Sequence, residues 1–445
     1  MKRIFFFITT CFLISPGITF SQNKVWSLGE CITYAIDNNI QIKQQVLQTE
    51  FQKTTLDLSK LKLLPTINAS ASHDYSFGRA LDLSQYEYVD RNALNDYFYV
   101  GGGMTIFNGL INYNTIRKNR FELLAGQEDL RNIKDNISLS IALAYLQILL
   151  NKELVSATDN QLQITLQQIE KTRKMVDAGS SARGTLLQIE AQAAQEEVQL
   201  ITLKNQLDLS YLNITQLLEL NTPTGFEIVT PLISVDTNSL ISGSPEEIFA
   251  MAQGSRPEIK SAELKLSASE YDLRIARGSR YPRIALSHSV STRYSYIMNS
   301  PGNLPFNEQL KNYKNYGLGF SMNIPILNGW QVNKNISNSR LSIENSRFTL
   351  EGQKKQLFKN IQQAYADAAA SLKKYNATIK AVASMTESFR YTEQKFNVGM
   401  VTPVDYNAAK TQLLNAQSDM SQAKYEFVFK TKVLDFYRGI PLNLN

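Results

Sequence analysis

The 445-residue chain carries 46 lysine and arginine residues against 40 acidic residues, a net charge of +6, with only two cysteines and two histidines. The basic residues are scattered along the chain and are not clustered with aromatic residues, which disfavours nucleic-acid binding. So few cysteine and histidine side chains also disfavour a zinc site.

The N-terminus has the features of a secretory signal peptide over residues 1–21. A basic dipeptide precedes an apolar run from Ile4 to Ile14, which is too short to span a membrane. Cleavage would leave Cys31 as the only cysteine, so we expect no intrachain disulfide. Glu30 directly before it argues against a lipidation site. No later stretch is expected to form a transmembrane helix, because none reaches roughly 18 apolar residues, so any membrane contact is expected from β-strands.

The first mature element is predicted to be a helix that begins at a capping box and runs to a proline. Ser27 and Glu30 can each satisfy a free amide of the first turn, and Pro65 ends the helical pattern. The same pattern returns 217 residues later, from Ser244 to Pro282. This recurrence is the first sign of an internal repeat.

Each of these prolines is followed by a pair of predicted strands. Apolar residues alternate with small polar ones from Ile67 to Phe77 and from Ile284 to Tyr296, and return strands follow at 97–107 and 313–327. Such two-faced strands are typical of membrane barrels but equally of a half-buried soluble sheet. Polar connections join the strands at 79–96 and 298–312. Seven aromatic residues near the strand ends are candidates for the membrane interface: Tyr75, Phe77, Tyr97, Tyr99, Tyr294, Tyr296 and Tyr313.

Two very long helices follow, each of them free of proline. Apolar, small and hydroxyl residues recur at alternating steps of four and three from Leu357 to Phe396, and again 220 positions earlier from Ile137 to Val176. This heptad spacing predicts a left-handed coiled coil about 100 Å long in each half. Helices that return from the far end are predicted at residues 185–219 and 405–438.

The chain is therefore divided into three segments. The first repeat covers residues 22–220, a connection covers residues 221–243, and the second repeat covers residues 244–445. Four strands in one chain cannot close a barrel, and open strand edges cannot face lipid. The predicted fold is a mixed α/β membrane protein. Its long helices form an α-helical barrel with coiled-coil packing, joined to a β-barrel that several chains close together.

The order of these elements, and the segment from Asn397 to Asp405, resemble the TolC family of outer-membrane export channels. The resemblance covers nearly all of residues 22–440. It implies a homotrimer with a twelve-stranded barrel in the outer membrane of a Gram-negative bacterium and a helical tunnel across the periplasm. It also implies an inner-membrane transporter and a periplasmic adaptor as partners, so that the chain gives passive exit to their cargo.

The turns between the long and returning helices carry the candidate site residues. Asp405 is a candidate for an acidic ring at the channel constriction, although an acid near a helix N-terminus is also favoured by the helix dipole alone. Thr185 occupies the corresponding place in the first repeat. Candidates for contact with the adaptor are Gly179, Gly399, Thr402 and Pro403.

No cofactor, metal site or catalytic motif is expected. His73 and His288 lie on matching strands and are predicted to share a face, but no acid stands near them at ligand spacing. The alternative to a channel is a periplasmic coiled-coil scaffold or adaptor whose strands form a soluble sheet. A secreted hydrolase, which would need a catalytic site, ranks last.

Overall fold

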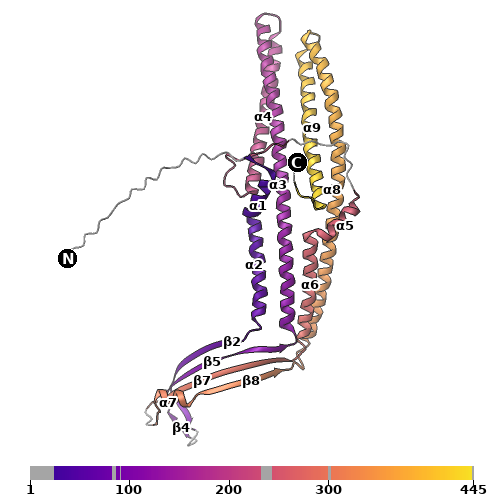
Figure 1. The fold of residues 1–445 in the computed structure, drawn as a ribbon. Helices are drawn as coiled ribbons and strands as arrows, with labels where there is room; N and C mark the ends of the chain where they lie inside the picture. Colours follow the sequence, from indigo (N-terminus) through magenta and orange to yellow (C-terminus); the bar gives the residue numbers. More distant parts are fainter. Residues whose placement is uncertain (1–24, 83–86, 91, 232–242, 299–301, 443–445) are drawn as a thin grey trace, which may run out of the picture.

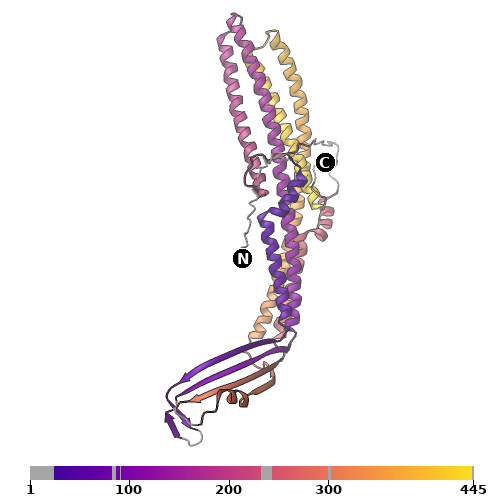
Figure 2. The same ribbon diagram turned by 60° about the vertical axis from the view of Figure 1, so that its left-hand side comes forward.

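The computed structural model describes residues 25–82, 87–90, 92–231, 243–298 and 302–442. The predicted signal peptide and part of the predicted connection between the repeats lie outside the described residues. The described part forms a long rod of helices, and an antiparallel sheet bends away to one side at one end of the rod (Figures 1 and 2). The opposite end consists of two helical hairpins.

The helix expected at the start of each half is broken into two. The four helices are α1 (Leu28–Asn38), α2 (Ile40–Leu61), α5 (Pro245–Ser255) and α6 (Pro257–Gly278). Both predicted capping boxes are confirmed, at Ser27 and at Ser244. The prediction of one continuous helix was wrong because Asn39 is extended and caps α2, while its amide group donates to the carbonyl of Leu217 at 3.0 Å. Arg256 is extended in the same way before α6.

Four strands form one antiparallel sheet in the order β2-β5-β7-β8. They are β2 (Thr66–Ser76), β5 (Ala93–Asn108), β7 (Arg283–Ile297) and β8 (Asn315–Asn323). The first connection contains a hairpin of β3 (Arg79–Asp82) and β4 (Glu87–Asp90), and the second contains α7 (Phe306–Asn312). Neither was predicted. Strand β8 is shorter than predicted at both ends: it starts at Asn315, because Tyr313 caps α7, and it ends at Asn323 rather than at Leu327.

The long helices are present as predicted. Helix α3 (Ile111–Asp177) and helix α8 (Gln331–Asn397) have 67 residues each, which corresponds to about 100 Å. Helix α4 (Arg183–Leu217) and helix α9 (Pro403–Tyr437) return beside them with 35 residues each. The predicted seam positions are buried or half-buried in both long helices. The heptad pattern therefore identifies the packed side of each helix correctly.

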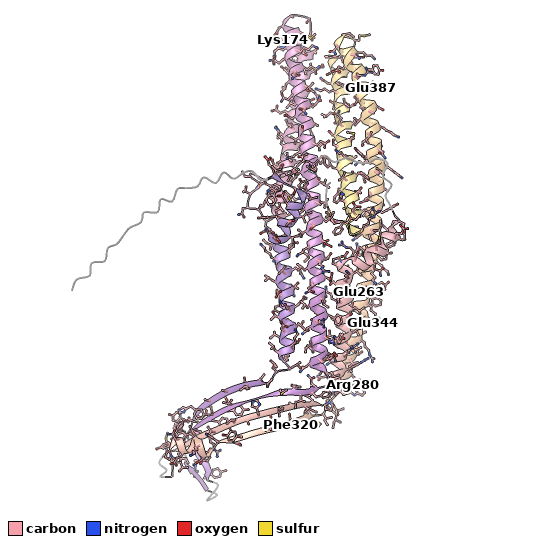
Figure 3. The ribbon with its side chains drawn as sticks, in the orientation of Figure 1. Lys174, Glu263, Arg280, Phe320, Glu344 and Glu387 are labelled. Atoms are coloured by element: carbon pink, nitrogen blue, oxygen red, sulfur yellow. The ribbon has the colours of Figure 1, made fainter. Side chains whose placement is uncertain are left out.

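Helix α3 lies at the centre of the rod. Near the sheet it packs between α2 and α6, and α6 in turn packs on α8; farther along, α4 flanks α3 and α9 flanks α8 (Figure 1). Lys174 and Glu387 mark the free ends of the two hairpins, and Phe320 marks β8 at the opposite end of the molecule (Figure 3). Both hairpins thus point away from the sheet.

The largest core lies halfway along the rod. Short strands β1 (Val25–Trp26) and β6 (Glu227–Ile228) pair in parallel, and the hydroxyl of Tyr145 on α3 donates to the carbonyl of Val229 at 2.5 Å. Cys31 is fully buried in this core. Among the described residues, α3 alone contains a stretch apolar and long enough for a membrane span. This corrects the expectation that no such stretch exists. Several of its apolar side chains, such as Ile148, are buried in this core, whereas Leu143 is exposed.

Candidate functional site

The two faces of the sheet differ in chemistry. The cross-strand register places Ala69, Val100 and Val290 in one row, and Ser70, Tyr99 and Ser291 in the next row on the opposite face. Side chains alternate between faces along each strand. We call the first the apolar face; its side chains are Ile67, Ala69, Ala71, His73, Tyr75, Leu94, Asp96, Phe98, Val100, Met104, Phe107, Ile284, Leu286, His288, Val290, Thr292, Tyr294, Tyr296, Tyr316, Leu318, Phe320 and Met322. The other, the polar face, carries mainly serine, asparagine and glycine.

The candidate interface aromatic residues divide between these faces. Tyr75, Tyr294 and Tyr296 belong to the apolar face at the end away from the helices, and the ring of Phe77 stacks on that of Tyr75. The other three candidates, Tyr97, Tyr99 and Tyr313, do not belong to this group on the apolar face. Tyr97 and Tyr99 stack on each other on the polar face, and the ring of Tyr313 lies under the guanidinium of Arg293, a polar-face residue. Because side chains alternate between the two faces along a strand, the neighbours of Phe98, Tyr97 and Tyr99, could have been predicted to lie on the face opposite to it.

The two histidines share the apolar face, as predicted, but do not form one site. His288 lies opposite Gly102, whereas His73 lies opposite Asp96, six positions along β5 and therefore about 20 Å away. The imidazole Nδ1 of His73 lies 2.5 Å from the Asp96 carboxylate. An acid does therefore stand beside a histidine, contrary to expectation. Within the described ranges, however, no three potential ligands come together to hold a metal ion.

Both tips are closed by the same backbone motif. The amide of Gly179 donates to the carbonyl of Val176, and the next amide, that of Ser180, donates to Met175; Gly399 repeats these bonds in the second tip. The two glycines have φ values of +70° and +76°. This is the Schellman arrangement, in which a left-handed residue ends the helix. The presence of glycine at both tip turns thus has a backbone reason.

Asp405 and Thr185 occupy matching third positions of α9 and α4 but do different things. The Asp405 carboxylate accepts hydrogen bonds from the Thr402 hydroxyl at 2.7 Å and the Thr402 amide at 3.2 Å, which completes a capping box. These bonds to Thr402 lower the pKa of the exposed Asp405 carboxyl. Helix α4 has Ala182 as its N-cap residue and therefore no side-chain cap. Asp405 therefore does stabilise the start of α9, and its carboxylate is nevertheless exposed and charged.

The second tip exposes apolar side chains around the candidate contact residues. Val398 and Met400 are 70% and 75% exposed, and Val404 follows Pro403, the first residue of α9. The corresponding residues of the first tip, Ala178, Ser180 and Gly184, are small or polar. Exposed apolar groups that are contiguous on a surface often mark a protein contact. The two tips are thus alike in backbone and unlike in surface.

A buried polar cluster connects the two hairpins. Lys410 on α9 is only 5% exposed, and its Nζ donates to the hydroxyl of Thr165 on α3 at 3.0 Å. That hydroxyl donates to the carboxylate of Glu196 on α4 at 2.6 Å, and Gln192 donates to the same carboxylate at 3.0 Å. Burial lowers the pKa of Lys410, and the charge of Glu196 partly offsets this. Sequence analysis missed this Lys410–Glu196 cluster. Its signal was a lysine four residues after Tyr406, on the buried side of α9.

Comparison with known proteins gives a consistent result. A family model described as outer membrane efflux protein matches residues 31–219 and 249–431. Outer membrane protein TolC of Escherichia coli is 21% identical over 423 residues, which cover 92% of this chain and 81% of that protein. Alkaline protease secretion protein AprF of Pseudomonas aeruginosa is 20% identical over 450 residues, which cover 99% of this chain and 89% of that protein.

Among solved structures, the chain is similar to CusC, whose structural description concerns folding and transmembrane channel formation. The TM-score is 0.80 at 17% identity, and the match covers 95% of this chain and 96% of that one. At this identity the likeness concerns the fold alone.

Proposed function

The chain belongs to the outer membrane efflux protein family, and from this membership we infer that it is the outer-membrane exit channel of an efflux or type I secretion system. It resides in the outer membrane of a Gram-negative bacterium, with its helices in the periplasm. The observation that carries the mechanism is the two-faced sheet at one end of a rod about 100 Å long. A wall with one apolar and one polar face can separate lipid from a water-filled passage.

The passage is proposed to be closed by three chains. Strands β2 and β8 each have one edge without a partner in the sheet, and an open edge cannot face lipid. Pairing of β8 with β2 of the next chain joins four strands per chain into a twelve-stranded barrel. A barrel larger than eight strands leaves an aqueous lumen. The polar face would line that lumen, so we assign Tyr97 and Tyr99 to it and Tyr75, Tyr294 and Tyr296 to the membrane interface.

Internal duplication is the proposed origin of this architecture. Helices α5 and α6 begin and end 217 residues after α1 and α2, and helices α8 and α9 begin and end 220 residues after α3 and α4. Matching bounds in four successive helices support a repeat of one ancestral unit, with residues 221–243 as the connection between the two copies.

The proposed partners are an inner-membrane transporter, which supplies cargo, and a periplasmic adaptor, which contacts the helix tips. The exposed apolar residues Val398, Met400 and Val404 around Gly399 support adaptor contact at the second tip. Gly179, Thr402 and Pro403 remain candidates for the same contact. The channel itself is proposed to be non-enzymatic and without a cofactor. A soluble scaffold would bury the apolar face of its sheet, whereas Tyr316, Leu318 and Phe320 are more than 70% exposed.

The function is tested by the conductance of the detergent-extracted assembly in a planar bilayer, with Asp405→Asn and Asp405→Ala beside the wild type. We expect current steps of uniform size and a lower cation preference in both variants, because each removes a negative charge at the proposed constriction. Asp405→Asn keeps an oxygen that can accept from Thr402, so it separates charge from helix capping. Asp419→Asn, farther along α9, is the control and is expected to leave ion preference unchanged.

Two outcomes contradict parts of this proposal. Steps whose ion preference is the same in all four proteins place the constriction away from Asp405 but keep the channel. A protein that is recovered from the soluble periplasm as a monomer and gives no steps contradicts the channel itself.

A further inference from the structure

A shallow hollow lies on the apolar face of the sheet. It is lined by residues 69–71 of β2, 98–100 of β5, 290–292 of β7, and Lys314. Six of the strand residues belong to the apolar face by register, which shows that the hollow lies on this side. The hollow forms where the small side chains of Ala69 and Ala71 lie beside the larger side chains of Phe98 and Val100. The hollow has the apolar lining that an acyl chain requires.

One cation stands at the edge of this hollow. Lys314 directly precedes β8, is exposed, and continues the alternation of Tyr316 and Leu318 onto the apolar face. Within the described strands, the apolar face carries no other lysine or arginine, and no carboxylate of the described residues forms an ion pair with Lys314. A lysine on a lipid-facing surface is costly in proportion to its depth. An anionic group from the membrane would remove that cost.

The local structure holds Lys314 at this place. The preceding helix α7 is fastened to the edge of β7: the Gln309 side chain bonds both the amide and the carbonyl of Ser295 at 2.9 Å. The ring of Phe306 packs against those of Phe98 and Tyr294 at 6.4 and 5.0 Å. Helix α7 therefore packs beside Phe98, which lines the hollow, and fixes the backbone from which Lys314 extends.

We propose that this hollow binds a phosphate-bearing acyl lipid of the outer leaflet, with an acyl chain along Ala69 and Ala71 and a phosphate at Lys314. The outer leaflet is the source because α7, which ends two residues before Lys314, lies toward the end of the sheet away from the periplasmic helices (Figure 1). The inference rests on the proposed channel function, since that function places the apolar face in the outer membrane.

The test is native mass spectrometry of the detergent-extracted assembly titrated with bisphosphorylated lipid A. We expect Lys314→Gln to weaken lipid binding at least tenfold, because it removes the cation. Ala71→Leu should weaken it as well, because it fills the hollow while Lys314 stays. Lys311→Gln, an exposed lysine of α7 that does not line the hollow, is the matched control and should bind as the wild type does.

Two further probes separate the sources of the phosphate. Lipid A without its phosphates should bind the wild type only weakly. Its affinity should be no higher than the affinity of phosphorylated lipid A for Lys314→Gln. Phosphatidylglycerol that binds as tightly as lipid A overturns the assignment to the outer leaflet, and wild-type affinity in Lys314→Gln overturns the site. Conductance of the same preparations distinguishes these results from failure of the channel function: intact current steps with no lipid A bound contradict this inference alone.

Discussion

Lys410 directly joins the two halves of the chain. Its ammonium group is buried between α9 and α3, and Thr165 connects it to Glu196 on α4. A buried charge is tolerated only when it is paired and hydrogen-bonded. The cluster therefore favours one relative placement of the two hairpins and resists others.

Replacing Lys410 with methionine is expected to lower the free energy of unfolding by about 1–3 kcal/mol, because Glu196 and Thr165 lose the cation while staying buried. Glu196→Gln in the same chain should restore part of this loss. The measurement is the unfolding of wild type, both single variants and the double variant in one detergent. Additive losses would show that the two groups are not coupled.

The pH dependence of this cluster has a defined sign. Burial lowers the pKa of Lys410 in the folded protein, so the unfolded chain binds a proton that the folded chain lacks between that pKa and about 10.5. The free energy of unfolding should therefore gain a contribution from Lys410 as pH rises through this interval. Lys410→Met should lack the gain. The difference in melting temperature between the two proteins, measured from pH 7 upward, is expected to grow, and a constant difference would contradict the assigned pKa direction.

At the scale of elements, the helix tips depend on two glycines with positive φ. Gly179→Ala and Gly399→Ala should each cost about 1–2 kcal/mol locally, since an alanine in the left-handed region is strained. No other atom would obstruct the added methyl group at either position, so the whole effect is due to the backbone. Gly184→Ala is the control: it lies inside α4 in ordinary helical conformation and should stabilise that helix slightly. Faster hydrogen exchange of the last turns of α3 or α8 in the tip variants, but not in the control, is the expected result.

The elements that were predictable are those whose causes are local. The capping boxes at Ser27 and Ser244 and the heptad seams of the long helices follow from residues a few positions apart. The break at Asn39 depends partly on Leu217, which lies 178 positions away, although an asparagine and, in the second half, Pro257 were visible N-terminal signals. Helix α7 depends in the same way on contacts with β7, which no periodicity reveals.

For the candidate sites, the place of a residue along the chain was easier to predict than the groups that surround its side chain. The tip turns at Gly179 and Gly399 were found from glycine spacing. A local pattern placed Asp405 near a helix N-terminus, but its hydrogen bonds to Thr402 were not predicted. Its proposed role at the constriction depends on neighbouring chains. Lys410 was missed because a lysine is usually placed on the solvated side of a helix, and only the packing of three helices shows that this one is buried.

At the scale of the whole molecule, the central prediction is that β8 of one chain pairs with β2 of another. Ser70→Cys on β2 is combined in turn with Asn315→Cys, Ser321→Cys and Asn323→Cys on β8, all exposed polar-face positions. At least one pair should form a disulfide between chains and give species of one, two and three chains on a denaturing gel. Cys31 is fully buried and should not interfere.

Each single-cysteine variant is the control and should remain one chain on the gel. Crosslinked species larger than three chains would contradict a closed trimer. The absence of crosslinks in every pair, in preparations that still conduct, would show that the strand edges meet in another way.

Equal helix lengths in the two halves set a condition on how such a molecule can change its height. Helices α3 and α8 have 67 residues each, and α4 and α9 have 35 each. An insertion that lengthened one helix alone would shift its seam out of register with its neighbours. Only a seven-residue insertion keeps the same side of a helix inward, and it adds about 10 Å. Relatives that bridge a wider gap between two membranes should therefore differ in steps of one heptad, made together in the outgoing and returning helices of both halves.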